Sequence, residues 1–214
     1  MDFFPQTETT FLLSGPAGDL EVLVSPPKED IVKTPCVAVI SHPHPLYGGT
    51  MNNKVVSTLA RAFANLGLST VRFNFRGVGK SAGSFAEGEG ELDDLLAVVD
   101  WVKTMRPNDK IWLAGFSFGA GVSAFAATKI PVAQLVTIAP PVPRFGLLEL
   151  PPVECPWLVV QGEDDDVVIP QDVYNWVETR DPKPKLIRIP GAGHFFHGTL
   201  MELRHNLEAA LGDS

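Results

Sequence analysis

The sequence predicts an α/β fold in which helices cover both faces of a mostly parallel β-sheet. Short runs rich in strand-forming residues alternate with runs whose apolar residues recur at helical spacing, along most of the 214 residues. The run at 36–42 is continuously apolar, which is typical of a strand buried on both faces. Because helices connect successive strands, right-handed crossovers bring the carboxyl ends of the strands to one edge, where ligands bind in such sheets.

Each element has its own signal in the order of the chain. The runs at 9–15 and 20–26 flank a short turn and predict an opening antiparallel hairpin. The strand at 36–42 precedes a helix at 52–67, which ends at Gly67. Three more pairs of strand and helix are predicted, at 69–75 with 91–105, 110–116 with 117–129, and 157–162 with 171–180. Strands at 134–140 and 185–191 and a closing helix at 198–212 complete the pattern.

Composition and charge narrow the class of protein and its partners. Apolar residues make up 45% and charged residues 20% of the chain, which favours one globular unit. The net charge of −8 disfavours a nucleic acid or an anionic membrane as partner. The two cysteines lack CxxC spacing, and neither a basic leader nor an apolar run of about 18 residues is present. We therefore expect a soluble cytoplasmic protein with a small-molecule partner.

Reactive side chains follow several of the predicted strands. The segment "PHPLYGG" follows the strand at 36–42, and Ser117 follows the strand at 110–116. The acidic run "GEDDD" ends the strand "WLVVQ", and "GAGHFFHG" follows the last predicted strand. A hydroxyl, carboxylates and histidines are therefore expected at one edge of the sheet.

Ser117 lies in the segment Gly115-Phe116-Ser117-Phe118-Gly119, a G-x-S-x-G pattern at a predicted strand-to-helix turn. A sharp turn that lifts the seryl oxygen out of the sheet leaves no room for a Cβ two residues before or after it. The amide of Phe118, at the start of the next helix, would point at a developing oxyanion. A helix N-cap is the simpler interpretation of Ser117, but it accounts for only one of the two glycines.

A serine nucleophile requires a histidine base, which comes last in the chain order expected for this topology. His194 lies between glycines beyond the last predicted strand, and we take it as the base. His197 is the weaker alternative. His205 falls inside an amphipathic helix, where an exposed face is the simpler interpretation.

The supporting carboxylate is expected within Glu163–Asp166, directly after a buried strand. Such an acidic run is usually a solvated face. Here at least one carboxylate should face the edge of the sheet that carries Ser117. Asp165 is our choice, with Asp164 and Asp166 as alternatives.

A second oxyanion donor is expected from the loop after the strand at 36–42. Pro43 and Pro45 have no N–H, so the amide of His44 is the first choice and that of Leu46 the second. His42 and His44 can also be interpreted as metal ligands. No acidic cluster with ligand spacing accompanies them, and we predict no metal site.

Taken together, these motifs resemble the α/β-hydrolase superfamily, and more narrowly its small capless branch akin to dienelactone hydrolase. The resemblance covers nearly the whole chain and is carried by "SHPHPLYGGTMNNKVV", "FNFRGVGKSAG", "GFSFG", "QGEDDDVV" and "GAGHFFHG". It implies a three-layer α/β-hydrolase sandwich, a single domain over residues 1–214 without a separate cap. Ser117 matches the family's nucleophile, His194 its base, and Asp165 the acid of its G-x-x-D-x-x-V pattern. Dienelactone hydrolases proper use a cysteine nucleophile, so their substrate is not inherited.

The expected function is a serine hydrolase that cleaves a small ester-like substrate through an acyl-enzyme, without a cofactor. Ester, thioester, lactone and amide bonds share this machinery, so the bond is left open. Where larger relatives insert a cap, "PVPRFGLLELPPVECP" is proline-rich and too short for a helical lid, so we expect an open site. Candidate substrate contacts are Tyr47, Phe116 and Phe195, with Phe118, Phe145 and Phe196 as further apolar walls.

Two other functions fit the sequence less well. "RGVGKSAG" contains G-x-G-x-x-A and "GKS", but Asn74 stands where a phosphate-binding loop needs glycine, and the next helix begins only near Glu89. A nucleotide-binding oxidoreductase is therefore a poor second, and a plain glycine-rich connection is preferred. A catalytically silent hydrolase fold that binds a ligand is the other alternative, against which the complete Ser, Asp and His set argues.

Overall fold

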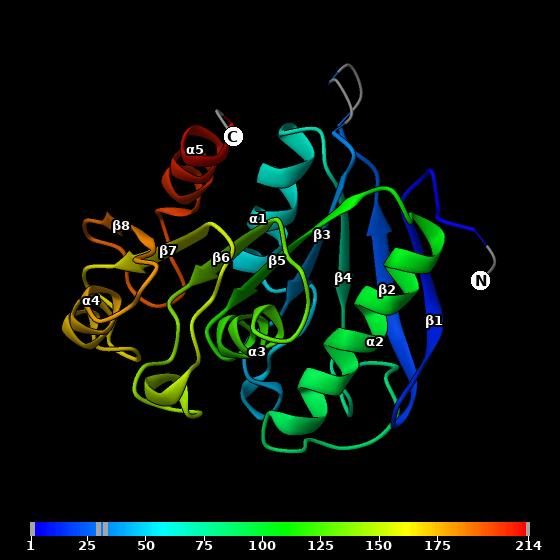
Figure 1. Ribbon diagram of the computed structural model, residues 1–214, viewed down its shortest axis with the longest axis horizontal. Helices are drawn as coiled ribbons and strands as arrows, with labels where there is room; N and C mark the ends of the chain where they lie inside the picture. The colour runs from blue at the N-terminus through cyan, green and yellow to red at the C-terminus, as the bar shows by residue number, and fades with distance from the viewer. Residues whose placement is uncertain (1–2, 29–30, 32–33, 213–214) are drawn as a thin grey trace.

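Eight strands form one twisted sheet in the computed structural model, which describes residues 3–28, 31 and 34–212 (Figure 1). The strands are β1 (Thr9–Gly15), β2 (Gly18–Ser25), β3 (Cys36–Ser41), β4 (Ser69–Phe73), β5 (Lys110–Phe116), β6 (Gln134–Ile138), β7 (Trp157–Gly162) and β8 (Lys185–Ile189). Their order across the sheet is β1-β2-β4-β3-β5-β6-β7-β8. Strand β2 pairs antiparallel with β1 and β4, and all other neighbours are parallel.

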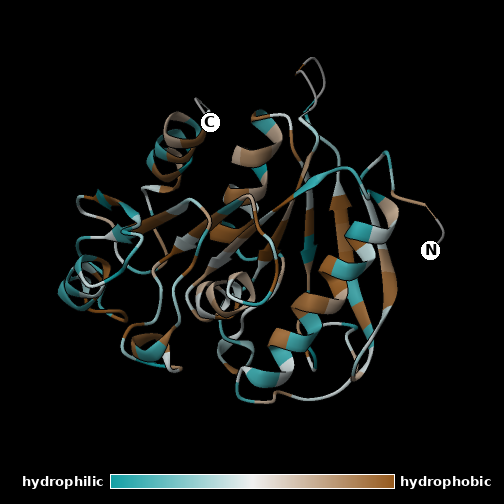
Figure 2. Cartoon of the chain, in the orientation of Figure 1, coloured by the Kyte–Doolittle hydropathy of each residue, from teal (hydrophilic) through white to brown (hydrophobic). Residues whose placement is uncertain are grey.

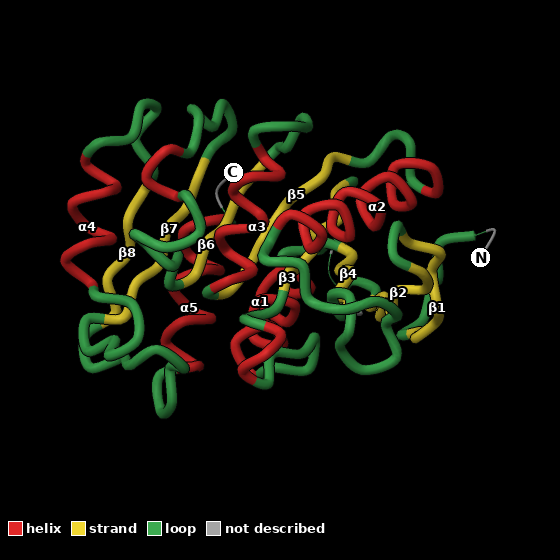
Figure 3. Tube along the Cα trace, turned by 90° about the horizontal axis from the view of Figure 1, so that it is seen from below, coloured by secondary structure: helices red, strands yellow, loops and turns green. Residues whose placement is uncertain are grey.

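Helices cover both faces of this sheet, as the sequence predicts. The helices are α1 (Lys54–Asn65), α2 (Glu89–Met105), α3 (Phe118–Ala127), α4 (Pro170–Glu178) and α5 (Leu200–Leu211). Figure 3 shows α2, α3 and α4 on one side of the strands and α1 and α5 on the other. The predicted mostly parallel α/β fold with its opening hairpin is therefore confirmed, with element ends shifted by a few residues. Among the described residues, no helix combines the length and the apolar character needed to cross a membrane.

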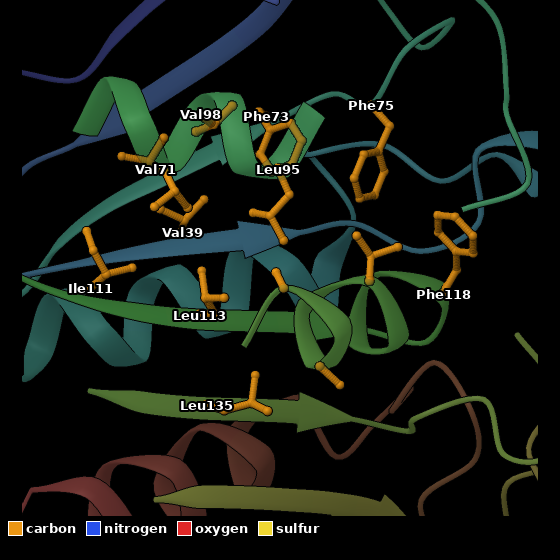
Figure 4. Packing of buried hydrophobic residues seen from close by; sticks show 14 of the residues in the cluster. Val39, Val71, Phe73, Phe75, Leu95, Val98, Ile111, Leu113, Phe118 and Leu135 are labelled. Atoms are coloured by element: carbon orange, nitrogen blue, oxygen red, sulfur yellow. The ribbon is translucent and has the colours of Figure 1, made fainter. Parts of the chain in front are cut away.

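Two apolar layers hold the sheet between the helices. On one side, Val39, Val71 and Leu113 of the strands pack against Leu95 and Val98 of α2 (Figure 4). The opposite layer joins the other face of the central strands to α1 and α5. Burial on both faces explains why β3 is continuously apolar, with all six of its residues buried. In Figure 2 the central strands are accordingly mostly hydrophobic, whereas α2 alternates between the two colours as it turns.

The glycine-rich segment after β4 is a connection fixed by hydrogen bonds within the protein. The side chain of Asn74 accepts a bond from the amide of Met51 (2.8 Å) and donates one to Glu21 (2.8 Å). The Ser81 hydroxyl donates to the Asn74 carbonyl oxygen (2.7 Å). A Cβ on Gly79 would lie 2.5 Å from both the Asn74 and Glu21 side chains. Gly79 is therefore explained by close packing in a loop that connects β4 to α2, as preferred from the sequence, without a bound nucleotide.

A buried ion pair ties this connection to α2. The Arg76 guanidinium donates to both carboxylate oxygens of Asp94 (3.0 and 2.7 Å), and the Arg76 amide donates a third bond to the same group (3.0 Å). The Asp94 side chain is fully buried, and its hydrogen bonds raise the pKa of Arg76. A paired and fully hydrogen-bonded buried charge is tolerated, whereas either partner alone is costly.

We therefore predict that Asp94→Ala lowers the free energy of unfolding by about 3–5 kcal/mol, because Arg76 loses its partner in a nearly buried position. Urea denaturation measures this loss. Glu178→Ala is the matched control, since the Glu178–Lys183 pair is exposed and its removal should cost less than about 1 kcal/mol. Equal losses in the two variants would contradict the prediction.

Candidate active site

Ser117 occupies the single residue between β5 and α3. Its φ of 53° and ψ of −118° lie in a region that residues with a side chain rarely adopt. The Ser117 amide donates to the carbonyl oxygen of Ile138 in β6 (2.8 Å), which fixes the turn to the neighbouring strand. Within the described chain, the Ser117 hydroxyl caps none of the amides of α3. A capping role therefore does not account for this serine.

The two glycines around Ser117 are required by close backbone contacts. A Cβ on Gly115 would lie 2.1 Å from the carbonyl oxygen of Gly119. A Cβ on Gly119 would lie 2.5 Å from the carbonyl oxygens of both Ser41 and His42. The end of β3 and the start of α3 thus approach too closely for any side chain, which is the mechanical reason expected from the sequence.

His194 lies beside Ser117, in the loop between β8 and α5. Its Nε2 is 3.1 Å from the Ser117 Oγ, and its Nδ1 is 2.9 Å from the Asp165 Oδ2. The ring is 4% exposed and packs on Phe116, with ring centroids 5.0 Å apart. The structure therefore brings together the three side chains that the sequence selected from different loops.

Asp165 is held in place by the loop that follows β7. Its Oδ1 accepts bonds from the amides of Val167 (2.9 Å) and Val168 (2.8 Å), and its Oδ2 accepts one from Gln161 Nε2 (3.0 Å). Burial raises the pKa of Asp165, but the hydrogen bonds from His194 and from the two amides outweigh it, and the pKa falls below its usual value. The buried carboxylate therefore stays ionised beside the imidazole.

The alternative side chains lie outside this line. Asp164 and Asp166 are exposed on either side of Asp165, and His197 is exposed as well. His205 is exposed on α5, as the amphipathic pattern indicates. Of the four acidic residues after β7, Asp165 alone is buried, which separates it from its neighbours.

Two backbone amides near Ser117 are candidates for an oxyanion hole. Within the described residues, no hydrogen bond engages the amides of Phe118 or His44. His44 precedes a short 3₁₀ turn, Pro45–Tyr47, and its Nδ1 accepts the amide of Leu46 (3.2 Å). The Leu46 amide is therefore already used within its own loop, which favours His44 over Leu46 as the second donor.

A cavity of about 510 Å³ opens over Ser117 and His194. Tyr47 and Phe195 line it, as expected, together with Phe118 and Phe145. Two further polar residues of its lining, Asn53 and Arg144, were not singled out from the sequence. Gln161 was also missed from the sequence, although a polar residue next to the end of a buried strand is a usable signal.

Two of the expected apolar contacts, Phe116 and Phe196, do not line the cavity. Phe116 is fully buried and packs beneath His194, so it supports the imidazole and does not line the cavity. Phe196 is also fully buried in the layer between the sheet and the helices α1 and α5. Phe116 is the last residue of β5, and the strand's alternation turns its ring to that face of the sheet.

His42 has a structural explanation. Its Nε2 accepts the amide of Phe75 (3.0 Å), so the proton lies on Nδ1, which donates to the Pro43 carbonyl oxygen (2.6 Å). Burial lowers the pKa of His42 to about 4, and the ring stays neutral. Both ring nitrogens are occupied, and the described residues contain no group of three or more side chains suited to a metal ion.

The comparison with known proteins agrees with the fold. A family profile described as the alpha/beta hydrolase fold matches residues 46–154. The chain belongs to the α/β-hydrolase fold family. This α/β hydrolase is similar to a serine hydrolase without a lid from Xanthomonas campestris, at 47% identity and a TM-score of 0.95, with 98% of this chain and 95% of the other covered.

Further relatives of this α/β hydrolase extend over most of its length. A serine hydrolase homologue from Coxiella burnetii is 49% identical, with a TM-score of 0.94 and coverage of 97% of this chain and 99% of the other. An uncharacterized protein of Rickettsia prowazekii is 37% identical over 170 residues, which are 75% of this chain and 71% of that protein. The two serine hydrolase relatives support hydrolase activity at the level of the family.

We predict that Gly119→Ala lowers the free energy of unfolding by about 1–3 kcal/mol, because its Cβ would collide with two backbone carbonyls. Gly121→Ala, two residues further along α3, is the control. A Cβ there meets no atom nearer than 3.6 Å, and alanine favours the helix by up to about 1 kcal/mol. Thermal unfolding of both variants measures the difference, and similar melting temperatures would contradict the account of the turn.

The low pKa of His42 in the folded protein predicts that the protein loses stability in acid. Its pKa in the folded protein is about 4, below the ordinary 6.5, so only the unfolded chain takes up this proton between those values. The contribution is complete above pH 6.5 and falls by up to about 3 kcal/mol as the pH decreases to 4. Denaturation between pH 4 and 6.5 should show a shallower slope in His42→Asn than in the wild type. Equal slopes would exclude His42 as the source.

Proposed function

We propose that this α/β hydrolase cleaves small ester-like acyl substrates, with Ser117 as nucleophile, His194 as general base and Asp165 as the supporting acid. The observation that carries the proposal is the continuous line from the Ser117 Oγ through His194 to the Asp165 carboxylate, with spacings of 3.1 and 2.9 Å. The line ends at the floor of an open cavity. Such spacings suit proton transfer between a hydroxyl and an imidazole.

In the first half of the reaction, His194 Nε2 takes the proton from the Ser117 hydroxyl as the oxygen attacks the substrate carbonyl carbon. The amides of Phe118 and His44 donate to the oxygen that becomes negative, and removal of one such donor typically slows the reaction by about 10²–10³. Asp165 keeps the imidazole in the tautomer with the proton on Nδ1, and its charge stabilises the imidazolium. His194 then gives the proton to the departing alcohol, which leaves the acyl group on Ser117.

In the second half, His194 takes a proton from water, and the resulting hydroxide attacks the acyl carbonyl. The bond to the Ser117 Oγ breaks, the oxygen regains its proton from His194, and the acid is released. The proposed reaction requires only groups of the protein and water, so it uses no cofactor. Thioesters, lactones and activated amides present the same carbonyl to the same groups.

The surroundings of Ser117 suit small acyl groups and leave longer ones free to extend beyond the catalytic cavity. Residues 139–156, between β6 and β7, contain a single 3₁₀ turn at Leu147–Glu149 in place of a helical lid. Tyr47 and Phe195 are 86% and 46% exposed, and they stand at the mouth of the cavity as apolar contacts for an approaching ester. The proposed binding partner is therefore a small-molecule ester.

We predict that Ser117→Ala remains folded but loses p-nitrophenyl acetate hydrolysis and labelling by a fluorophosphonate. Asp165→Asn should retain the fold and lower kcat by about 10⁴-fold, because asparagine cannot stabilise the His194 imidazolium and favours the His194 tautomer with the proton on Nε2. Asp164→Asn, the exposed neighbour, is the matched control and should keep wild-type activity. Activity that survives Ser117→Ala would rule out Ser117 as the nucleophile, and binding without turnover in the wild type would favour a silent ligand-binding protein.

A further inference from the structure

A second cavity of about 310 Å³ lies beside the catalytic one. Helices α2 and α3 run next to each other on one face of the sheet (Figure 1). The cavity lies between these two helices and the loop before β7. Its apolar walls are Leu92, Phe118, Gly121, Val122, Phe125 and Phe145. Phe118 and Phe145 also line the catalytic cavity, so the two cavities share a wall.

The shared wall consists of one fixed ring and one exposed ring. Phe118 is 2% exposed and packs edge-on against Phe75, which Figure 4 shows beside it. Phe145 meets Phe118 in a T-shaped contact, with centroids 5.1 Å apart, but is 40% exposed on the loop before β7. Exposed side chains change rotamer within nanoseconds. A turn of the Phe145 ring would therefore join the two cavities.

The position of His194 indicates which part of a substrate reaches the second cavity. The departing alcohol must lie near His194 Nε2, because that nitrogen returns the proton to it. His194 and Ser117 line only the catalytic cavity, whereas Phe118 lines both cavities. The acyl group leaves the reacting carbon in a different direction from the alcohol. An extended acyl chain directed past Phe118 and Phe145 would reach the second cavity.

We propose that this second cavity is a distal acyl subsite that takes the end of an elongated, uncharged alkyl or aryl acyl group. The proposal rests on the ester hydrolysis proposed above. The apolar walls would favour each additional buried methylene by roughly a factor of four. Glu87 and Glu89 stand exposed at the edge of the cavity, and no salt bridge within the described chain neutralises either carboxylate. An acyl chain that ends in a carboxylate would be repelled there.

Leu92 of α2 is a half-buried residue of the cavity wall, and its enlargement by mutation would narrow the cavity. Gly121 also lines the cavity, but a Cβ there would meet Pro141 at 3.6 Å and Leu147 at 3.8 Å, neither of which belongs to the cavity wall. A tryptophan in place of Leu92 would take up space that the acyl chain would occupy. Phe125, on the next turn of α3, lines the same cavity, and its truncation to alanine would enlarge it.

The test compares kcat/KM for p-nitrophenyl octanoate and p-nitrophenyl acetate. The octanoate-to-acetate ratio should fall at least tenfold in Leu92→Trp. The decanoate-to-acetate ratio should rise in Phe125→Ala. Ala210→Leu is the matched control, because it enlarges a helical residue at a separate cavity near β7 and β8, and it should keep the wild-type ratio. The p-nitrophenyl ester of a chain of octanoate length that ends in a carboxylate should react at least tenfold more slowly than octanoate.

Each result decides between the subsite and the reaction itself. An unchanged octanoate-to-acetate ratio in folded Leu92→Trp would overturn the subsite while leaving ester hydrolysis intact. If Leu92→Trp does not fold, an unchanged decanoate-to-acetate ratio in Phe125→Ala would overturn it equally. Wild-type protein that hydrolyses neither acetate nor octanoate would instead remove the proposed function, and the subsite with it.

Discussion

The close backbone approach where β5 turns into α3 is the constraint on which the site depends. The carbonyl oxygens of Ser41, His42 and Gly119 occupy the positions that side chains at Gly115 and Gly119 would need. With both glycines in place, the chain can reverse within one residue, and that residue is forced to a φ of 53°. The strained serine is thereby raised above the carboxyl edge of the sheet. Its neighbours in space are loops from β3, β7 and β8, which the parallel topology brings to the same edge.

Electrostatics at this edge balance burial against hydrogen bonding. Asp165 and His194 are both nearly buried, which on its own would favour neutral forms. Two loop amides and Gln161 supply the carboxylate with partners, and its charge is retained where the imidazolium of the reaction would form. His42 shows the opposite balance. Burial there keeps the ring neutral, so it can accept an amide and hold the loop that presents His44.

The sequence was sufficient for the fold and for the three aligned side chains, because both follow from local patterns. Continuous apolar runs marked the parallel strands, and glycines two residues on either side of Ser117 marked the turn. The apolar contacts were harder to predict. Phe116 and Phe195 are both phenylalanines next to a candidate catalytic residue, but the first is buried and the second is exposed. Which face a ring takes depends on where the strand ends. The second cavity and the shared Phe118–Phe145 wall depend on packing between α2, α3 and a distant loop, which no local pattern encodes.

The central claim is that Ser117 carries the acyl group between the two halves of the reaction. The most direct measurement is mass spectrometry of protein quenched in acid during turnover of p-nitrophenyl acetate, followed by peptide mapping. The account predicts one acetyl group per chain on the peptide that contains Ser117, and its disappearance as water completes the cycle. Turnover with no acetyl group on Ser117, or with stable acetylation only at another residue, would contradict it.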